Sequence, residues 1–130
     1  MNMAKIEEIK QKHLATKQRN TAEKAVEAKA HEDAVNALCE RILEHLGSDA
    51  AYDDDAGTAW VKISYSIDDY GGIIRDTTRL ILPGGNAIGL PDYDYGEERY
   101  RNIWRDVFNK FDQLEGFAVD GRKITMLLED

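Results

Sequence analysis

The sequence has few of the residues from which catalytic and metal sites are built. Its 130 residues include one cysteine, Cys39, and three histidines, and they contain neither an HExxH nor a CxxC motif. A single cysteine excludes an internal disulfide and is typical of a protein of the reducing cytoplasm. The apolar runs are too short to cross a bilayer, and no hydrophobic signal-peptide segment follows the start. We therefore expect a cytoplasmic protein without a cofactor, a metal ion or a membrane partner.

The candidate chemical sites favour structural interpretations. Along one helix, at 1.5 Å per residue, His13, His31 and His45 would lie roughly 27 and 21 Å apart, too far to share a metal ion. Cys39 lies among apolar helix positions without a histidine on its helix face, which favours a small core residue over a nucleophile. The glycines of the predicted loop 83–91 lack both GxGxxG spacing and the Lys-Ser/Thr pair of a P-loop. The sequence therefore does not indicate an enzyme.

The strongest pattern is an amphipathic helix over residues 94–116. Its apolar face, spaced i, i+3, i+4, i+7, consists of Tyr100, Ile103, Trp104, Val107, Phe108, Phe111 and Leu114. Asp94 can cap the first turn, and Gly116 follows the last periodic residue as a C-terminal stop. Because this face carries one tryptophan and two phenylalanines, we expect it to be buried against a sheet.

The N-terminal third of the chain is predicted to be helical in two parts. Residues 1–20 are mostly polar, with Ile6, Ile9 and Leu14 as the only large apolar side chains after Met3, so we expect a basic helical arm that is frayed or mobile. The Asn-Thr-Ala-Glu sequence at 20–23 offers a cap for a new helix that ends before Gly47. Residues 21–130 are therefore expected to form a single α+β domain.

Four segments have the patterns of β-strands. Residues 58–67 alternate between apolar and polar side chains, and residues 73–82 return after a turn as their hairpin partner. Residues 117–119 and 122–129 flank Asp120-Gly121, a strong hairpin signal. The order is a long N-terminal helix followed by ββαββ, which predicts a four-stranded antiparallel sheet packed on one amphipathic helix. The sequence leaves open which face of the sheet the N-terminal helix covers.

The net charge of −8 is unevenly distributed. Residues 1–24 hold six Lys and Arg against three Glu, a balance of +3 that leaves −11 for the remainder. Residues 42–61, which include the predicted acidic loop 48–57, and residues 80–98 contain no Lys or Arg. Such loops with interleaved tyrosines suit docking onto a basic groove, although they could also serve only to keep the domain soluble. The predicted partner-binding residues are Asp53, Asp54, Asp55, Asp68, Asp69, Tyr70, Asp92, Tyr93, Asp94, Tyr95, Glu97 and Glu98.

The basic arm is a second candidate contact. Its cations could bind phosphates, but residues 1–24 contain no aromatic side chain for stacking on bases, and a solvated helix surface is the alternative. The cations are Lys5, Lys10, Lys12, Lys17 and Arg19.

The order of elements, with a basic arm leading into a compact acidic body, resembles the small phage-encoded anti-CRISPR proteins. The likeness depends on the arm, the hairpin 58–82, the helix 97–115 and the closing strands 117–129. It implies a phage inhibitor in the host cytoplasm, which docks its acidic loops into a basic groove of a nucleic-acid-handling protein such as a CRISPR effector.

The sequence also allows a second function. Residues 21–46 carry a partial heptad of apolar residues, Ala28, Val35, Leu38 and Ile42. Such a stripe could form a short coiled coil, so the alternative is a structural or assembly module that dimerises through this helix.

Overall fold

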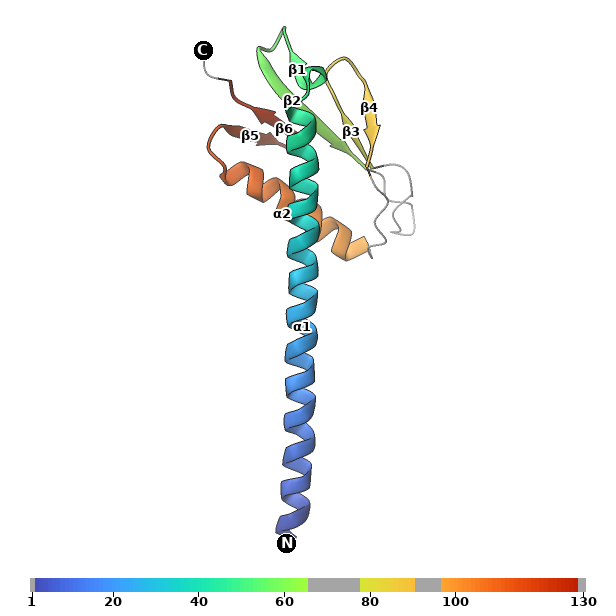
Figure 1. Ribbon diagram of the computed structural model, residues 1–130, viewed down its shortest axis with the longest axis vertical. Coiled ribbons are helices and arrows are strands. Elements are labelled where there is room, and N and C mark those ends of the chain that lie inside the picture. Colours follow the sequence, from blue (N-terminus) through green and yellow to red (C-terminus); the bar gives the residue numbers. More distant parts are fainter. Residues whose placement is uncertain (1, 66–77, 91–96, 129–130) are drawn as a thin grey trace. The chain divides into compact units, whose positions relative to one another are not determined.

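The computed structural model describes residues 2–65, 78–90 and 97–128 (Figure 1). The chain divides into two compact units, Met1–Ala34 and Val35–Asp130. The elements are α1 (Met3–Leu46), the short 3₁₀ helix η1 (Asp49–Ala51), β1 (Tyr52–Asp53), β2 (Thr58–Ser64), β3 (Arg79–Ile81), β4 (Ala87–Gly89), α2 (Glu97–Gln113), β5 (Phe117–Asp120) and β6 (Lys123–Met126). The fold is α+β, as predicted. Within the described ranges, neither helix has an apolar stretch long enough to span a membrane.

The helix α1 is continuous, and the prediction of a new helix near residue 21 is wrong. Asn2 caps its start, because the side-chain Oδ1 accepts a hydrogen bond from the backbone N–H of Ala4 at 3.0 Å. Thr21 does not cap a second helix. Its hydroxyl instead donates to the carbonyl of Lys17 one turn earlier, as threonine does inside a continuous helix.

Among the described residues the sheet has six antiparallel strands, so the prediction of four is not confirmed. The order is β4-β3-β2-β6-β5, and β1 pairs with the start of β2. Both additional strands lie in segments predicted to be loops. Gly84 and Gly85 adopt φ of +87°, and this tight turn folds β4 back onto β3. On the other side, Gly57 has φ of +64° in the turn that folds β1 onto β2.

The hairpin of β5 and β6 confirms the signal at Asp120-Gly121, with a shift of one residue in the turn. Asp120 pairs with Lys123, so the two residues of the turn are Gly121 and Arg122. Gly121 supplies the positive φ, +60°, that such a turn requires.

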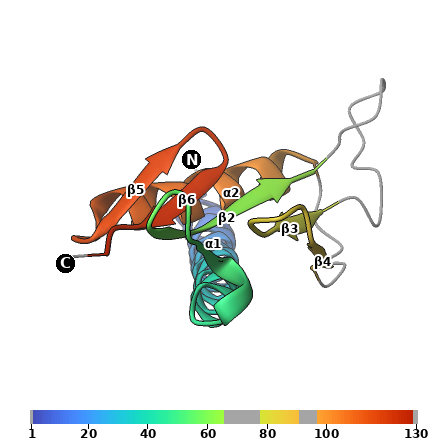
Figure 2. The same ribbon diagram turned by 90° about the horizontal axis from the view of Figure 1, so that it is seen from above.

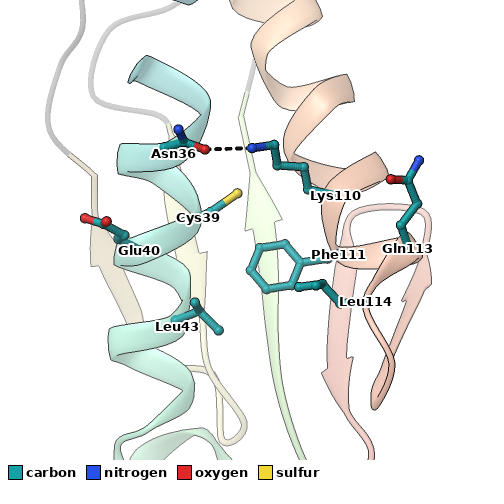
Figure 3. Close-up of a pocket in the computed structure, with 8 residues that line it drawn as sticks. All are labelled: Asn36, Cys39, Glu40, Leu43, Lys110, Phe111, Gln113 and Leu114. Atoms are coloured by element: carbon teal, nitrogen blue, oxygen red, sulfur yellow. Dashed lines mark hydrogen bonds between the residues drawn. The ribbon is translucent and has the colours of Figure 1, made fainter. Parts of the chain in front are cut away.

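One face of the sheet forms the core. Val61 and Ile63 of β2 are fully buried, as are their cross-strand partners Ile124 and Leu80. Two helices cover this face, where the sequence predicted one, because the apolar stripe of α1 is also broad from residue 35 onward. The end of α1 and α2 lie side by side in front of the strands (Figure 3). They bury Val35, Leu38, Ile42 and Leu46 from α1 and Ile103, Trp104, Val107 and Phe111 from α2.

The opposite face of the sheet, called the open face below, carries the alternate side chains of the same strands. Trp60 and Lys62 of β2 lie on it, and Lys62 is exposed. Within the described part of Val35–Asp130, the end of α1 and α2 pack on the buried face of the sheet, whose strand order can be followed in Figure 2.

Candidate functional site

A groove separates the end of α1 from α2 on the helical side of the sheet (Figure 3). Its volume is about 540 Å³, within the range of ligand and side-chain binding pockets. It is lined by Asn36, Cys39, Glu40 and Leu43 from α1 and by Lys110, Phe111, Gln113 and Leu114 from the end of α2 and the turn after it. We call it the α1–α2 groove.

The middle of the groove is apolar. Phe111 forms its floor at 1% exposure and is supported from beneath by Phe117, whose ring centroid lies 5.3 Å away. Leu43 and Leu114 flank this floor from the two helices and are 42% and 49% exposed. Two half-exposed leucines that face each other across a phenylalanine form a strip suited to an apolar side chain of a partner.

One end of the groove is closed by a polar contact. Lys110 Nζ donates a hydrogen bond of 2.7 Å to Asn36 Oδ1, which links the two helices. Burial raises the pKa of the neighbouring Cys39 thiol, and the Lys110 charge offsets only part of this. The thiol therefore stays protonated at neutral pH, and Cys39 is not an activated nucleophile.

The other end leads to an acidic segment. Glu40 lines the rim, and Glu44 follows one turn later with only a long contact of 3.8 Å to Arg41 on the same exposed helix surface. Beyond α1, Asp54 and Asp55 are exposed in the turn between β1 and β2. Residues 42–61 contain no Lys or Arg, so the cations that act on these acids come from outside this segment: Arg41 beside Glu44 and Lys123 on Asp53.

Asp53 differs from its two acidic neighbours because its carboxylate is used within the fold. Oδ2 accepts the indole N–H of Trp60 at 3.1 Å, and Oδ1 accepts the backbone N–H groups of Asp55 and Ala56. The Trp60 hydrogen bond, with these backbone donors, lowers the pKa of Asp53 below its usual range. Asp53 therefore shapes the turn, and Asp54 and Asp55 remain available to a partner.

The described members of the predicted acidic site do not come together. Asp53–Asp55 precede β2, whereas Glu98 is exposed in the first turn of α2. That turn lies at the far end of β2, because Tyr65, just after the strand, contacts Tyr100 with ring centroids 5.6 Å apart. Seven strand residues separate the two groups by about 23 Å.

Most other residues of the predicted acidic site lie outside the described ranges. Glu97 begins α2, but its side chain is not described. The residues outside the described ranges are Asp68, Asp69, Tyr70, Asp92, Tyr93, Asp94 and Tyr95.

The basic arm belongs to the N-terminal unit. All five of its predicted contact residues are exposed on α1. Across the described residues, His, Cys, Asp and Glu side chains form no group of three that could hold a metal ion.

The sequence analysis missed the α1–α2 groove. The prediction placed Leu114 on the buried face of the helix over residues 94–116. Leu114 instead lies in the turn after α2, which ends at Gln113, and so remains half-exposed. The one available signal was Leu43, a large apolar residue that does not fit the stripe of α1.

Comparison with known proteins found no matching family model, no matching curated protein and no matching solved structure.

Proposed function

We propose that this chain is a non-enzymatic binding protein whose α1–α2 groove receives a basic amphipathic helix of a protein partner. The observation that carries the proposal is the apolar strip of Leu43, Phe111 and Leu114 between the end of α1 and the end of α2. A helix that docks in such a groove inserts apolar side chains spaced by three or four residues. The partner's other face then remains free to contact the rim.

The charge around the groove supports a basic partner. Glu40 and Lys110 line the groove, and Glu44, Asp54 and Asp55 are exposed in the segment that follows Glu40 in the chain. Lysines or arginines on the partner helix would meet these carboxylates, which accelerates association and selects against acidic partners. Basic segments of this kind occur in proteins that handle nucleic acids, so inhibition of such a protein, a CRISPR effector among them, is part of this proposal.

Dimerisation through residues 21–46 is less well supported. Val35, Leu38 and Ile42, on which that alternative depends, are buried within the C-terminal unit. The smaller alanines of the stripe would have to hold two helices together alone, and they offer too little apolar surface for a stable coiled coil.

The test uses two fluorescein-labelled synthetic helices, one of leucine and lysine and one of leucine and glutamate. We expect the full chain to bind the lysine helix in fluorescence anisotropy and to bind the glutamate helix far more weakly. Leu114→Asp and Leu43→Asp should each weaken binding at least tenfold, because they place a charge in the apolar strip. Leu127→Asp is the matched control, since Leu127 is 51% exposed and does not line the groove.

The charge contribution is tested separately with Asp54→Lys/Asp55→Lys, which leaves Asp53 and its turn intact. We expect several-fold weaker binding and a smaller dependence on salt. Circular dichroism checks that each variant is folded. Equal binding of the two helices, or a Leu127→Asp effect as large as that of Leu114→Asp, would contradict the proposal.

A further inference from the structure

The open face of the sheet holds a line of cations that the fold does not require. Lys62 of β2 and Lys123 of β6 are directly opposite each other in the register. Arg79 of β3 pairs with Ser64, two residues along β2 from Lys62, and so is its diagonal neighbour on the same face. Paired side chains lie about 5 Å apart and diagonal ones about 7–8 Å, and like charges directly opposite destabilise a sheet.

The acids that the structure describes on this face oppose only one cation of that line. Asp53 accepts hydrogen bonds from Trp60 and from its own turn, and the charge of Lys123 also acts on it. Asp120 at the end of β5 is the cross-strand partner of Lys123 and opposes one cation of the three. In a chain with a net charge of −8, a row of three cations on adjacent strands, of which the described acids on this face oppose only Lys123, indicates an anionic ligand.

Trp60 lies beside this row in a fixed orientation. Its N–H donates to Asp53, and Lys123 Nζ lies over one face of its ring, 4.4 Å from the centroid. Since the indole donor is already used and Lys123 covers one face, what the half-buried side chain can offer a ligand is the other face of the ring. An aromatic face beside lysines is the arrangement on which bases of single strands stack, whereas an acidic peptide has no group that needs this face.

Space remains around the third cation. Across from Arg79 and Ile81, the outward positions of β4 are Gly89 and Ala87, whose small size leaves the guanidinium accessible. Together with Thr78 and Leu90, these positions line a shallow pocket of about 290 Å³. A phosphate could enter it and contact Arg79 directly.

From this juxtaposition we infer that the open face binds single-stranded nucleic acid, with Arg79, Lys62 and Lys123 on the phosphates and Trp60 under a base. The inference uses side chains on the opposite face of the sheet from the α1–α2 groove. It is therefore independent of the proposed function, and either can fail alone.

The experiment titrates the full chain into fluorescein-labelled oligothymidylate of about twelve nucleotides at low salt, read by anisotropy. We expect binding that weakens with salt. Lys62→Ala/Lys123→Ala should lower the affinity at least tenfold and reduce the slope of log K against log salt by about 1.4, since each single-strand phosphate contact contributes about 0.7. The control Lys24→Ala/Lys29→Ala removes the same charge from exposed positions of α1 and should change the affinity less than twofold.

Tryptophan emission tests the stacking. Trp104 is buried, so quenching on binding should come from Trp60 and should disappear in Trp60→Phe, which retains an aromatic face and most of the affinity. Trp60→Ala should weaken binding about tenfold. Thermal melts confirm that the variants are folded.

Three results would overturn the inference. One is the absence of binding at low salt. Another is an equal effect of the Lys24/Lys29 control, which would assign the charge contact to α1. The third is equally tight, competing binding of a polyglutamate peptide, which would indicate an acidic protein as the ligand.

Discussion

The two parts of α1 form one helix by hydrogen bonding, yet they differ in what stabilises them. From residue 2 to residue 29 every side chain is exposed except that of Ile6, which is half-buried. From Val35 onward, by contrast, four apolar side chains are buried in the core. The first part depends on helix propensity and its Asn2 cap, whereas the second is stabilised by tertiary packing. The comparison teaches that a regular helix does not indicate where the stable domain begins.

The largest expected effect is a loss of unfolding free energy from a core substitution, which tests the difference between the two parts of α1. Ile42→Ala should lower the free energy of unfolding by about 2–5 kcal/mol, because Ile42 is fully buried. Leu14→Ala, in the exposed part of α1, should change it by less than about 0.5 kcal/mol. Urea unfolding measures both, and equal costs would mean that the exposed part of α1 is packed in solution.

A glycine substitution in each part of α1 tests the same difference in stability at single positions. Ala37→Gly should destabilise the C-terminal unit by about 1 kcal/mol, measured in urea. Ala22→Gly should loosen its own part of α1 to a similar extent, seen as faster amide exchange, without changing the global unfolding of the C-terminal unit. A global loss from Ala22→Gly would show that the two parts unfold together.

Acid should affect the C-terminal unit through Asp53. The hydrogen bond from Trp60 lowers the pKa of Asp53, so the charged carboxylate stabilises the folded state above about pH 4. This contribution is lost as the pH falls through the lowered pKa. Asp53→Asn should therefore cost a little stability at pH 7 and show a shallower loss below pH 4, in urea unfolding at both pH values.

The matched control for this acid effect is Asp54→Asn, at an exposed neighbouring position. Its free energy of unfolding should equal that of the unchanged protein at both pH values. A flattened acid response in Asp54→Asn as well would contradict the assignment to Asp53.

The smallest effect is expected from removing residues 1–29. The C-terminal unit keeps its whole buried core, so its urea midpoint should hardly move. A large shift would show that the exposed part of α1 contributes to the stability of that unit.

Local chemistry made parts of this fold predictable. The spacing of the aromatic residues predicted α2, and Asp120-Gly121 predicted the hairpin of β5 and β6. The two missed strands, β1 and β4, have two and three residues, too few for an alternating pattern. They exist because glycine turns return the chain to a neighbouring strand that supplies the hydrogen bonds.

The candidate sites were less predictable because they depend on which strands and helices become neighbours in the fold. The grouping of acids along the chain was visible, but the use of Asp53 as the partner of Trp60 depends on the pairing of β1 with β2. The α1–α2 groove likewise brings Leu43 and Leu114 together from positions far apart in the sequence.

By itself, the sequence determined which side chains share a helix face or a strand face, because periods of 3.6 and 2 residues follow from backbone geometry. Only the tertiary structure decided which faces are covered and which residues become neighbours. Lys62 meets Lys123 because β2 and β6 pair in one register, and Lys110 meets Asn36 because two helices share one face of the sheet. Such contacts depend on how the whole core packs, which no local pattern encodes.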